Sequence, residues 1–270
     1  MADLPKHLTS LGLKHVRLFA ANSFDRDMCL KKLSIVNSSF VGHEILGNKL
    51  LEELEISESL VKVPNEEDYN DEMAGISTAF HASFFCADLS RLRHLRVLNL
   101  KVASRFTKGG MTELSFEQLH FCYQLPLLEE LRLESTSMPV CIADELTQLS
   151  SLTSLTVSVA SPHSDVSARG SLIIMPEWLS MAALQHVHLD HANFRCGNEF
   201  LGLLSMKTLV SLRLTNCTPA DQHVGELVAA LMYGMGKHNP HVEVSFNDRC
   251  LTDLLDLDRT LPKAADDEWW

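Results

Sequence analysis

Residues 125–136, LPLLEELRLEST, constrain the fold of this chain more than any other segment. Its leucines follow the spacing L-x-x-L-x-L, in which the last two are separated by a single residue. Successive side chains of a β-strand point to opposite faces, so Leu131 and Leu133 share one face while Glu130 and Arg132 share the other. The segment therefore predicts a short strand that is buried on one face and open to solvent on the other.

The same spacing recurs along the whole chain. Nine units can be aligned by their first leucine-like residue, which lies at Leu13, Leu30, Leu51, Leu95, Leu128, Leu152, Leu184, Leu209 and, in a degraded form, Asn239. Apolar residues follow three and five positions later in each unit. The step between units varies from 17 residues (Leu13 to Leu30) to 44 residues (Leu51 to Leu95). The strands therefore keep the period better than the connections do, as in a stack of repeats with insertions.

These units resemble leucine-rich repeats, and Thr136 and Cys217 stand where such a repeat has Asn or Cys. The resemblance covers essentially the whole chain and implies an α/β fold. The implied fold is a leucine-rich repeat solenoid, or horseshoe, with a curved parallel β-sheet on the concave face and helices and irregular turns on the convex face. We expect one domain of about nine irregular repeats over residues 1–262, with an acidic insertion at 61–78 and an acidic tail at 263–270. Cys217 is expected to be small and buried.

The connections carry helix signals of uneven strength. Thr218-Pro219 has the pattern of an N-cap followed by a helix's first residue, and the apolar run at 224–235 then predicts the longest helix, ending near the glycines at 234 and 236. Asp248 is predicted to cap a helix through residue 257 that closes the C-terminal side of the stack. Other helical segments are predicted at residues 79–92, 115–122 and 176–179.

Composition limits the classes of partner. The net charge is -12, from 23 basic and 35 acidic residues, which argues against a binder of nucleic acid or of anionic membranes. The seven cysteines are scattered, odd in number and without a C-x-x-C pair, so a reducing compartment fits better than a disulfide framework or a thiolate zinc site. No signal-peptide pattern and no apolar run of membrane-span length occur. We therefore expect a cytoplasmic or nuclear protein that binds neither nucleic acid nor membranes.

The irregular repeats resemble the substrate-receptor half of F-box proteins and the sensor half of intracellular immune receptors. Only Leu4-Pro5 precedes the first repeat where an F-box would stand, and the P-loop pattern G-x-x-x-x-G-K-[ST] is missing. The resemblance therefore implies a non-catalytic protein–protein interaction module without a cofactor, in the manner of a ubiquitin-ligase substrate receptor or adaptor. The first repeat begins without an obvious cap, which suggests either that another chain of a larger complex shields this edge or that the sequence is one part of a larger protein.

One motif offers an alternative. Residues 186–191, HVHLDH, match the H-x-H-x-D-H signature of the metallo-β-lactamase superfamily. That resemblance implies a metal-dependent hydrolase in which His186 and His188 ligate one metal and Asp190 and His191 a second. Simple alternation along a strand explains the same residues without a metal, because it places both imidazoles on the exposed concave side. The motif is followed by Ala-Asn where that superfamily has glycine, and it lies late in the chain, so we expect a protein that is not an enzyme.

The side chains that flank the apolar positions line the concave face. Their charge alternates in blocks along the sheet, which either reflects favourable pairing between neighbouring strands or matches a partner with a striped charge pattern. Binding is predicted in the N-terminal two-thirds of this face, with Phe19, Arg96 and Arg132 contributing most affinity. The complete set of predicted partner-binding residues is Phe19, Lys32, Glu53, Arg96, Glu130, Arg132, His186, His188 and Arg213.

Overall fold

The structure is a computed structural model of the 270-residue chain. It describes residues 7–16, 29–41, 48–57, 60–62, 89, 91–101, 124–135, 148–159, 181–191, 193–194, 199–219, 224–247 and 249–251.

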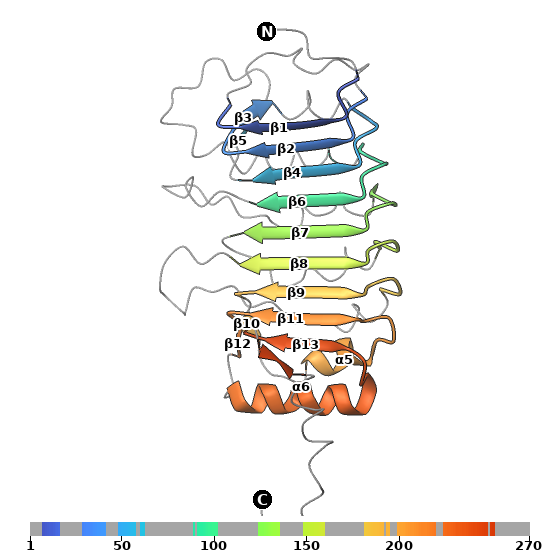
Figure 1. The fold of residues 1–270 in the computed structure, drawn as a ribbon, viewed down its shortest axis with the longest axis vertical. Coiled ribbons are helices and arrows are strands. Elements are labelled where there is room, and N and C mark those ends of the chain that lie inside the picture. The colour runs from blue at the N-terminus through green and yellow to red at the C-terminus, as the bar shows by residue number, and fades with distance from the viewer. Residues whose placement is uncertain are drawn as a thin grey trace, which may run out of the picture.

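One sheet of ten strands runs the length of the molecule (Figure 1). Nine of its strands are parallel neighbours, in the order β1 (Ser10–Lys14), β2 (Lys32–Val36), β4 (Glu53–Ser57), β6 (Val97–Lys101), β7 (Glu130–Ser135), β8 (Ser154–Val159), β9 (His186–Asp190), β11 (Ser211–Thr215) and β13 (Glu243–Phe246). Each repeat thus adds one strand beside the previous one. This confirms the predicted leucine-rich repeat solenoid.

The core lies behind the sheet in two continuous rows. Leu131 pairs in register with Leu98 and Leu155, and Leu133 pairs with Leu100 and Val157. All are buried, with Leu131 0% exposed. The same alternation holds in repeats two to eight, so the sequence frame is confirmed for those seven repeats. Cys217 is also buried, as predicted, and its sulfur lies within hydrogen-bond distance of the Leu189 and Thr215 carbonyl oxygens, either of which can accept its one proton.

A tight turn precedes the strand in repeats three to nine. In seven repeats the backbone N–H of the residue that opens the repeat donates to the carbonyl three residues earlier, over 2.9 to 3.4 Å, as in Leu95 to Leu92 and Leu128 to Leu125. The residue that accepts is itself buried in most repeats, which extends the motif to L-x-x-L-x-x-L-x-L. The repeated three-residue step is that of a 3₁₀-type turn.

Asparagine replaces this buried apolar residue in two repeats and completes the backbone hydrogen bonding there. Asn48 Nδ2 donates to the Leu30 carbonyl oxygen at 3.0 Å. Asn239 Nδ2 donates to the Met206 and Leu209 carbonyl oxygens, each at 3.1 Å. Buried carbonyl groups are costly when left without a donor, so each amide stabilises the junction between two repeats.

The first repeat is displaced from its predicted frame. Leu11 pairs with Leu33, and Leu13 with Ile35, so the repeat opens at Leu8 and not at Leu13. The backbone agrees, because the Thr9 carbonyl accepts the N–H groups of the second repeat as the equivalent carbonyls do elsewhere. The frame at Leu13 was wrong because apolar residues happen to follow it at the same two spacings.

The ninth repeat is shortened. Val244 pairs with Leu212 and Phe246 with Leu214, whereas the prediction placed Val242 and Val244 in those positions. Val242 is buried at the opening position, so one residue is missing between the opening and the strand. The Asn239 origin was therefore wrong.

Two further pairs of short strands form where the chain leaves the main sheet. β3 (Ser39–Val41) pairs with β5 (Leu60–Lys62), and β10 (Asn193–Phe194) pairs with β12 (Thr218–Pro219), both in parallel. Thr218-Pro219 therefore does not begin a helix as predicted. The chain stays extended there because β12 pairs with β10 of the preceding repeat.

Two helices of at least seven residues are described, α5 (Glu199–Ser205) and α6 (Val224–His238), and they pack against each other at the C-terminal end of the stack (Figure 1). The predicted long helix is confirmed, but it continues through Gly234 and Gly236 to His238. Gly234 is buried, and a Cβ placed there would lie 2.7 Å from Leu204 Cδ1. The glycine therefore allows close packing of α5 on α6 and does not end the helix.

The C-terminal side is closed by a hairpin. β14 (Arg249–Cys250) turns back antiparallel to β13, with Cys250 opposite Ser245. The helix predicted from Asp248 is thus wrong at residues 249–250, Leu251 is helical, and the continuation at 252–257 lies outside the described residues. So do the tail at 263–270, the predicted helices at 115–122 and 176–179 and most of that at 79–92, and the acidic insertion beyond Lys62. The predicted domain boundaries stay a prediction. No helix in the described part of the chain is long and apolar enough to cross a bilayer.

Candidate protein-binding surface

The face of the main sheet that points away from the core is called here the open face. Its side chains form three rows that cross the strands. The first row is Ser10, Lys32, Glu53, Val97, Glu130, Ser154, His186, Ser211 and Glu243. The second row is Gly12, Ser34, Glu55, Asn99, Arg132, Thr156, His188, Arg213 and Ser245. The third row is Lys14, Val36, Ser57, Lys101, Glu134, Ser158, Asp190 and Thr215.

Ion pairs join the second repeat to the third. Lys32 Nζ lies 2.5 Å from Glu53 Oε1 within the first row. Lys31 and Glu52, one residue ahead of these strands, pair at 2.7 Å. The hydrogen bond from Lys31 lowers the pKa of Glu52, and desolvation opposes this effect only in part. The positive charges of Lys31, Arg96 and Lys32 lower the pKa further. Basic and acidic repeats therefore neutralise each other across neighbouring strands.

The fourth and fifth repeats pair in the same way. Arg96 and Glu129 are joined at 2.6 Å, and Lys101 and Glu134 at 2.8 Å. The hydrogen bond and the charge of Glu129 raise the pKa of Arg96. Arg132 instead pairs along its own strand with Glu130, at 2.5 Å. The blocks of charge in the sequence thus correspond to cross-strand pairs, as the first of the two sequence explanations predicts. These pairs lie at the surface, exposed or half-buried, so each adds little to stability.

The open face changes character in repeats six to eight, where hydroxyl and imidazole groups predominate. His186 Nδ1 lies 2.9 Å from Ser211 Oγ in the first row. His188 Nε2 lies 2.9 Å from Thr215 Oγ1. This part of the surface offers hydrogen-bond donors and acceptors with less formal charge than repeats two to five.

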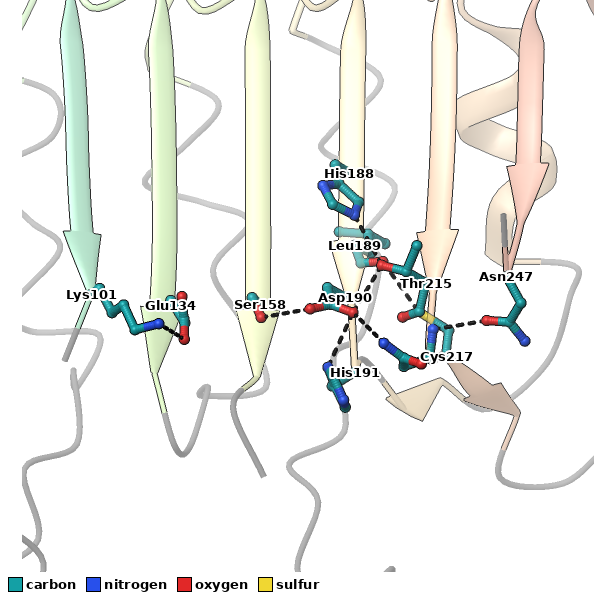
Figure 2. A network of polar contacts seen from close by, with 11 residues as sticks. Lys101, Glu134, Ser158, His188, Leu189, Asp190, His191, Thr215, Cys217 and Asn247 are labelled. Carbon is teal, nitrogen blue, oxygen red and sulfur yellow. Dashed lines mark hydrogen bonds and ion pairs between the residues drawn. The ribbon is translucent and has the colours of Figure 1, made fainter. Parts of the chain in front are cut away.

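Asp190 is the centre of a polar network at the end of β9 (Figure 2). One carboxylate oxygen accepts from Ser158 Oγ at 3.0 Å. The other accepts from Thr215 Oγ1 at 2.8 Å and from Asn216 Nδ2 at 3.1 Å, and it lies 3.1 Å from His191 Nδ1. Burial alone would raise the pKa of Asp190, but the hydrogen bonds from Thr215, Asn216 and Ser158 and the nearby His191 imidazole outweigh it, so the pKa of this carboxyl is lowered.

The direction of the protons limits what the network can do. A hydroxyl has one proton, and that of Thr215 points to the Asp190 carboxylate, which can only accept. His188 Nε2 must therefore donate to Thr215, which fixes the imidazole tautomer when the ring is neutral. In this arrangement His188 does not withdraw a proton from Thr215, so the three side chains do not form an activated nucleophile.

The HVHLDH motif is explained by the strand and by the turn after it. His186, His188 and Asp190 alternate on the open face, and His191 takes a left-handed backbone conformation with φ 53°. Equivalent turns after other strands place Asn37 and Asn216 in the same conformation, which Asn and His tolerate better than most residues. Among the described residues no group of three or more His, Cys, Asp or Glu side chains is arranged to hold a metal ion.

The predicted binding residues are placed as follows. Lys32, Glu53, Glu130 and His186 share the first row, Arg132, His188 and Arg213 the second, and Arg96 directly precedes β6. Phe19 lies outside the described residues, and the corrected first repeat presents Ser10, Gly12 and Lys14 on β1. The role of these residues in binding stays a prediction.

Sequence reasoning missed the partners of Asp190. Ser158, Thr215 and Asn216 come from three different turns or strands, and only the register of β8, β9 and β11 brings them together. The signal was available once the repeats were aligned, because Ser158, Asp190 and Thr215 occupy the same position in successive repeats.

Comparison with known proteins gives likenesses in structure. No family model matches the chain, and no curated protein sequence matches it. Among solved structures it is similar to the plant peptide hormone receptor RGFR1 in complex with RGF2 (TM-score 0.49, 15% identity, 90% of this chain and 36% of that chain). It is also similar to an internalin of Listeria monocytogenes (0.45, 12%, 88% and 66%) and to a leucine-rich repeat protein of Leptospira interrogans (0.34, 17%, 82% and 62%). The chain thus spans between 36% and 66% of the length of these proteins.

Proposed function

We propose that this chain is a non-catalytic protein-recognition module that binds a protein partner through the open face. The observation that carries the proposal is the face itself. Nine parallel strands present three unbroken rows of mostly polar side chains, while their apolar side chains point into the core. Long side chains remain reachable there, with those of Lys32, Arg96 and Arg132 all more than half exposed.

We propose that the centre of the interface lies near Arg132. This residue lies where the ion-paired repeats meet the hydroxyl and imidazole repeats, directly beside Thr156 in the second row. A central arginine can form two hydrogen bonds to one partner carboxylate, whereas charges at the rim mainly steer the encounter. The intrastrand pair with Glu130 holds the guanidinium on this face before binding.

The test exchanges the two charges without breaking their pair. In the double variant Glu130→Arg/Arg132→Glu the intrastrand ion pair can still form, but its order on the surface is reversed. The control exchanges two exposed residues of α6, Glu226→Lys/Lys237→Glu. Partners are captured from native lysate, identified by mass spectrometry and titrated against all three proteins.

We expect the exchange on the open face to weaken binding at least about tenfold, equivalent to about 1.4 kcal/mol, and the exchange on α6 to leave it unchanged. Full binding by the open-face variant together with loss in the α6 variant would place the interface on the helices instead.

The narrower proposal is a substrate receptor or adaptor of a ubiquitin ligase, acting inside the cell, in the cytoplasm or nucleus, as part of a larger complex. Its support is the resemblance of the irregular repeats to the repeat half of such receptors and the scattered cysteines, of which Cys29, Cys217 and Cys250 are free thiols. The test is whether the chain co-purifies with ligase subunits and whether its removal lowers ubiquitylation of the partner bound on the open face.

A further inference from the structure

The turns that precede the strands form a second surface, called here the turn ridge. In Figure 1 they follow one another along the side of the sheet where the arrows begin. The seven hydrogen-bonded turns comprise residues 48–50, 92–94, 125–127, 149–151, 181–183, 206–208 and 239–241. The turns of repeats three to eight are each followed by their strands in the same register, so equivalent positions of these neighbouring turns stack about 4.8 Å apart.

The turn ridge lacks acidic residues. None of its seven turns contains Asp or Glu, although the chain as a whole has 35 of them against 23 basic residues. Its exposed cations include Lys49, Arg93 and Lys207. Within the described parts of the chain neither Lys49 nor Arg93 makes an ion pair, in contrast to Lys31 and Arg96 beside them.

Exposed apolar side chains accompany these cations. Leu50 and Leu127 are 49% and 46% exposed, and both occupy the last position of their turn. His94 holds the same position in the turn between them. The ridge of repeats three to five therefore shows a row of leucine, imidazole and leucine about 10 Å long, beside a second row with Lys49 and Arg93.

We propose that the turn ridge of repeats three to five binds an acidic peptide segment of a partner protein that carries leucine-like or aromatic side chains. Carboxylates of the segment pair with Lys49 and Arg93, and its apolar side chains cover Leu50 and Leu127. Charge complementarity favours this occupant. The whole chain has a net charge of -12, but the ridge turns contain cations and no carboxylate, so they attract an acidic peptide and offer no partner to a basic one. The neighbouring carboxylates of Glu52 and Glu129 are already paired.

The ligand is sought with a phage-displayed library of random twelve-residue peptides, selected against the full chain. Selected peptides are synthesised and titrated by fluorescence anisotropy. The ridge variants are Lys49→Glu/Arg93→Glu and Leu50→Ser/Leu127→Ser. Their matched controls at the C-terminal end are Lys237→Glu/Arg249→Glu, with the same change in net charge, and Val224→Ser/Tyr233→Ser, with a similar loss of exposed apolar surface.

We expect the selected peptides to be acidic and to contain leucine-like or aromatic residues. Each ridge variant should bind them at least about tenfold more weakly, and the loss should be larger at low salt for the charged pair because salt screens exposed charges. Each control should bind as the unaltered chain does. Thermal unfolding confirms that every variant is folded.

Three outcomes overturn the proposal: selected peptides without an acidic excess, binding that survives both ridge variants, or equal losses in the C-terminal controls. Failure here is separable from failure of the proposed function. The variant Glu130→Arg/Arg132→Glu alters the open face only and should leave binding of the selected peptides unchanged.

Discussion

Gly234 provides the sharpest test of the packing that closes the C-terminal end. A Cβ at this position would lie 2.7 Å from Leu204 Cδ1 and 2.9 Å from Leu201 Cδ2, distances that real Cβ atoms essentially never show. Leu204 is fully buried, so its side chain has little room to move away. Gly236, on the same helix, has nothing within 4 Å of such a Cβ. The substitutions Gly234→Ala and Gly236→Ala therefore add the same methyl group in a crowded and in an open place.

The magnitude follows from two opposing effects. Replacing glycine by alanine within a helix favours the folded state by up to about 1 kcal/mol. Overpacking a filled core costs about 1–3 kcal/mol. The first effect is similar for both variants, so their difference in unfolding free energy isolates the second. We expect Gly236→Ala to be neutral or stabilising and Gly234→Ala to be less stable than it by about 1–3 kcal/mol.

Urea unfolding followed by circular dichroism measures this difference, provided that the slope with denaturant is the same for both variants. In a chain of this size the expected gap corresponds to several degrees in Tm, at about 2–4 °C per kcal/mol. Truncating the half-buried side chain in Gly234→Ala/Leu201→Ala should reduce the penalty. If Gly234→Ala is as stable as Gly236→Ala, α5 does not pack on α6 as closely as described.

Three further outcomes are expected. Leu131→Ala should lower the unfolding free energy by about 2–5 kcal/mol, whereas Glu130→Ala should stay within about 0.5 kcal/mol, and equal losses in chemical denaturation would refute the repeat frame. Asn239→Ala removes the donor to two carbonyl groups and should cost about 1–3 kcal/mol by the same measurement, with a loss near zero counting against the amide's role. The lowered pKa of Asp190 means that its ionised form stabilises the fold above the unfolded carboxyl pKa of about 3.9, and that this contribution is lost as pH falls through the lower folded pKa. The stability gap between the unaltered chain and Asp190→Asn should therefore shrink on acidification below about pH 4, and a gap that grows there would contradict the sign of the shift.

The central repeats were predictable because their sequence signal and their packing coincide. Every strand must bury one face against the next repeat, so leucine-like residues at two fixed positions are needed wherever the stack continues. Seven of nine repeats, from Leu30 to Leu209, follow this rule without exception. The additional buried residue three positions earlier, such as Leu92 or Leu125, obeys the same logic and could have been read from the sequence.

The ends of the stack were less predictable because a terminal repeat has a neighbour on one side only. On β1, Leu11 and Leu13 are only partly buried, so packing does not demand a unique frame and Val16 offers an equally good pattern. At the other end one residue is lost before β13, and β14 folds back to cover two residues of its edge. Val242, Val244 and Phe246 alternate along the chain, so the same two spacings fit both the predicted frame and the observed one.

For the surface, the sequence predicts which side chains of a single strand point outward, but not which side chains of neighbouring strands pair. That Arg132 and His188 face away from the core follows from alternation within one strand. That Lys32 pairs with Glu53, while Arg132 pairs with Glu130 and not with the next strand, depends on which side chains the register sets side by side. Asp190 shows the consequence most clearly. In sequence it belongs to an apparent metal motif, but in the stack it is the acceptor shared by Ser158 of one neighbouring repeat and Thr215 and Asn216 of the other. Because several donors already satisfy this carboxylate, it has a weaker tendency to bind a cation. Its hydrogen bonds also connect β8, β9 and β11 at the end of the open face.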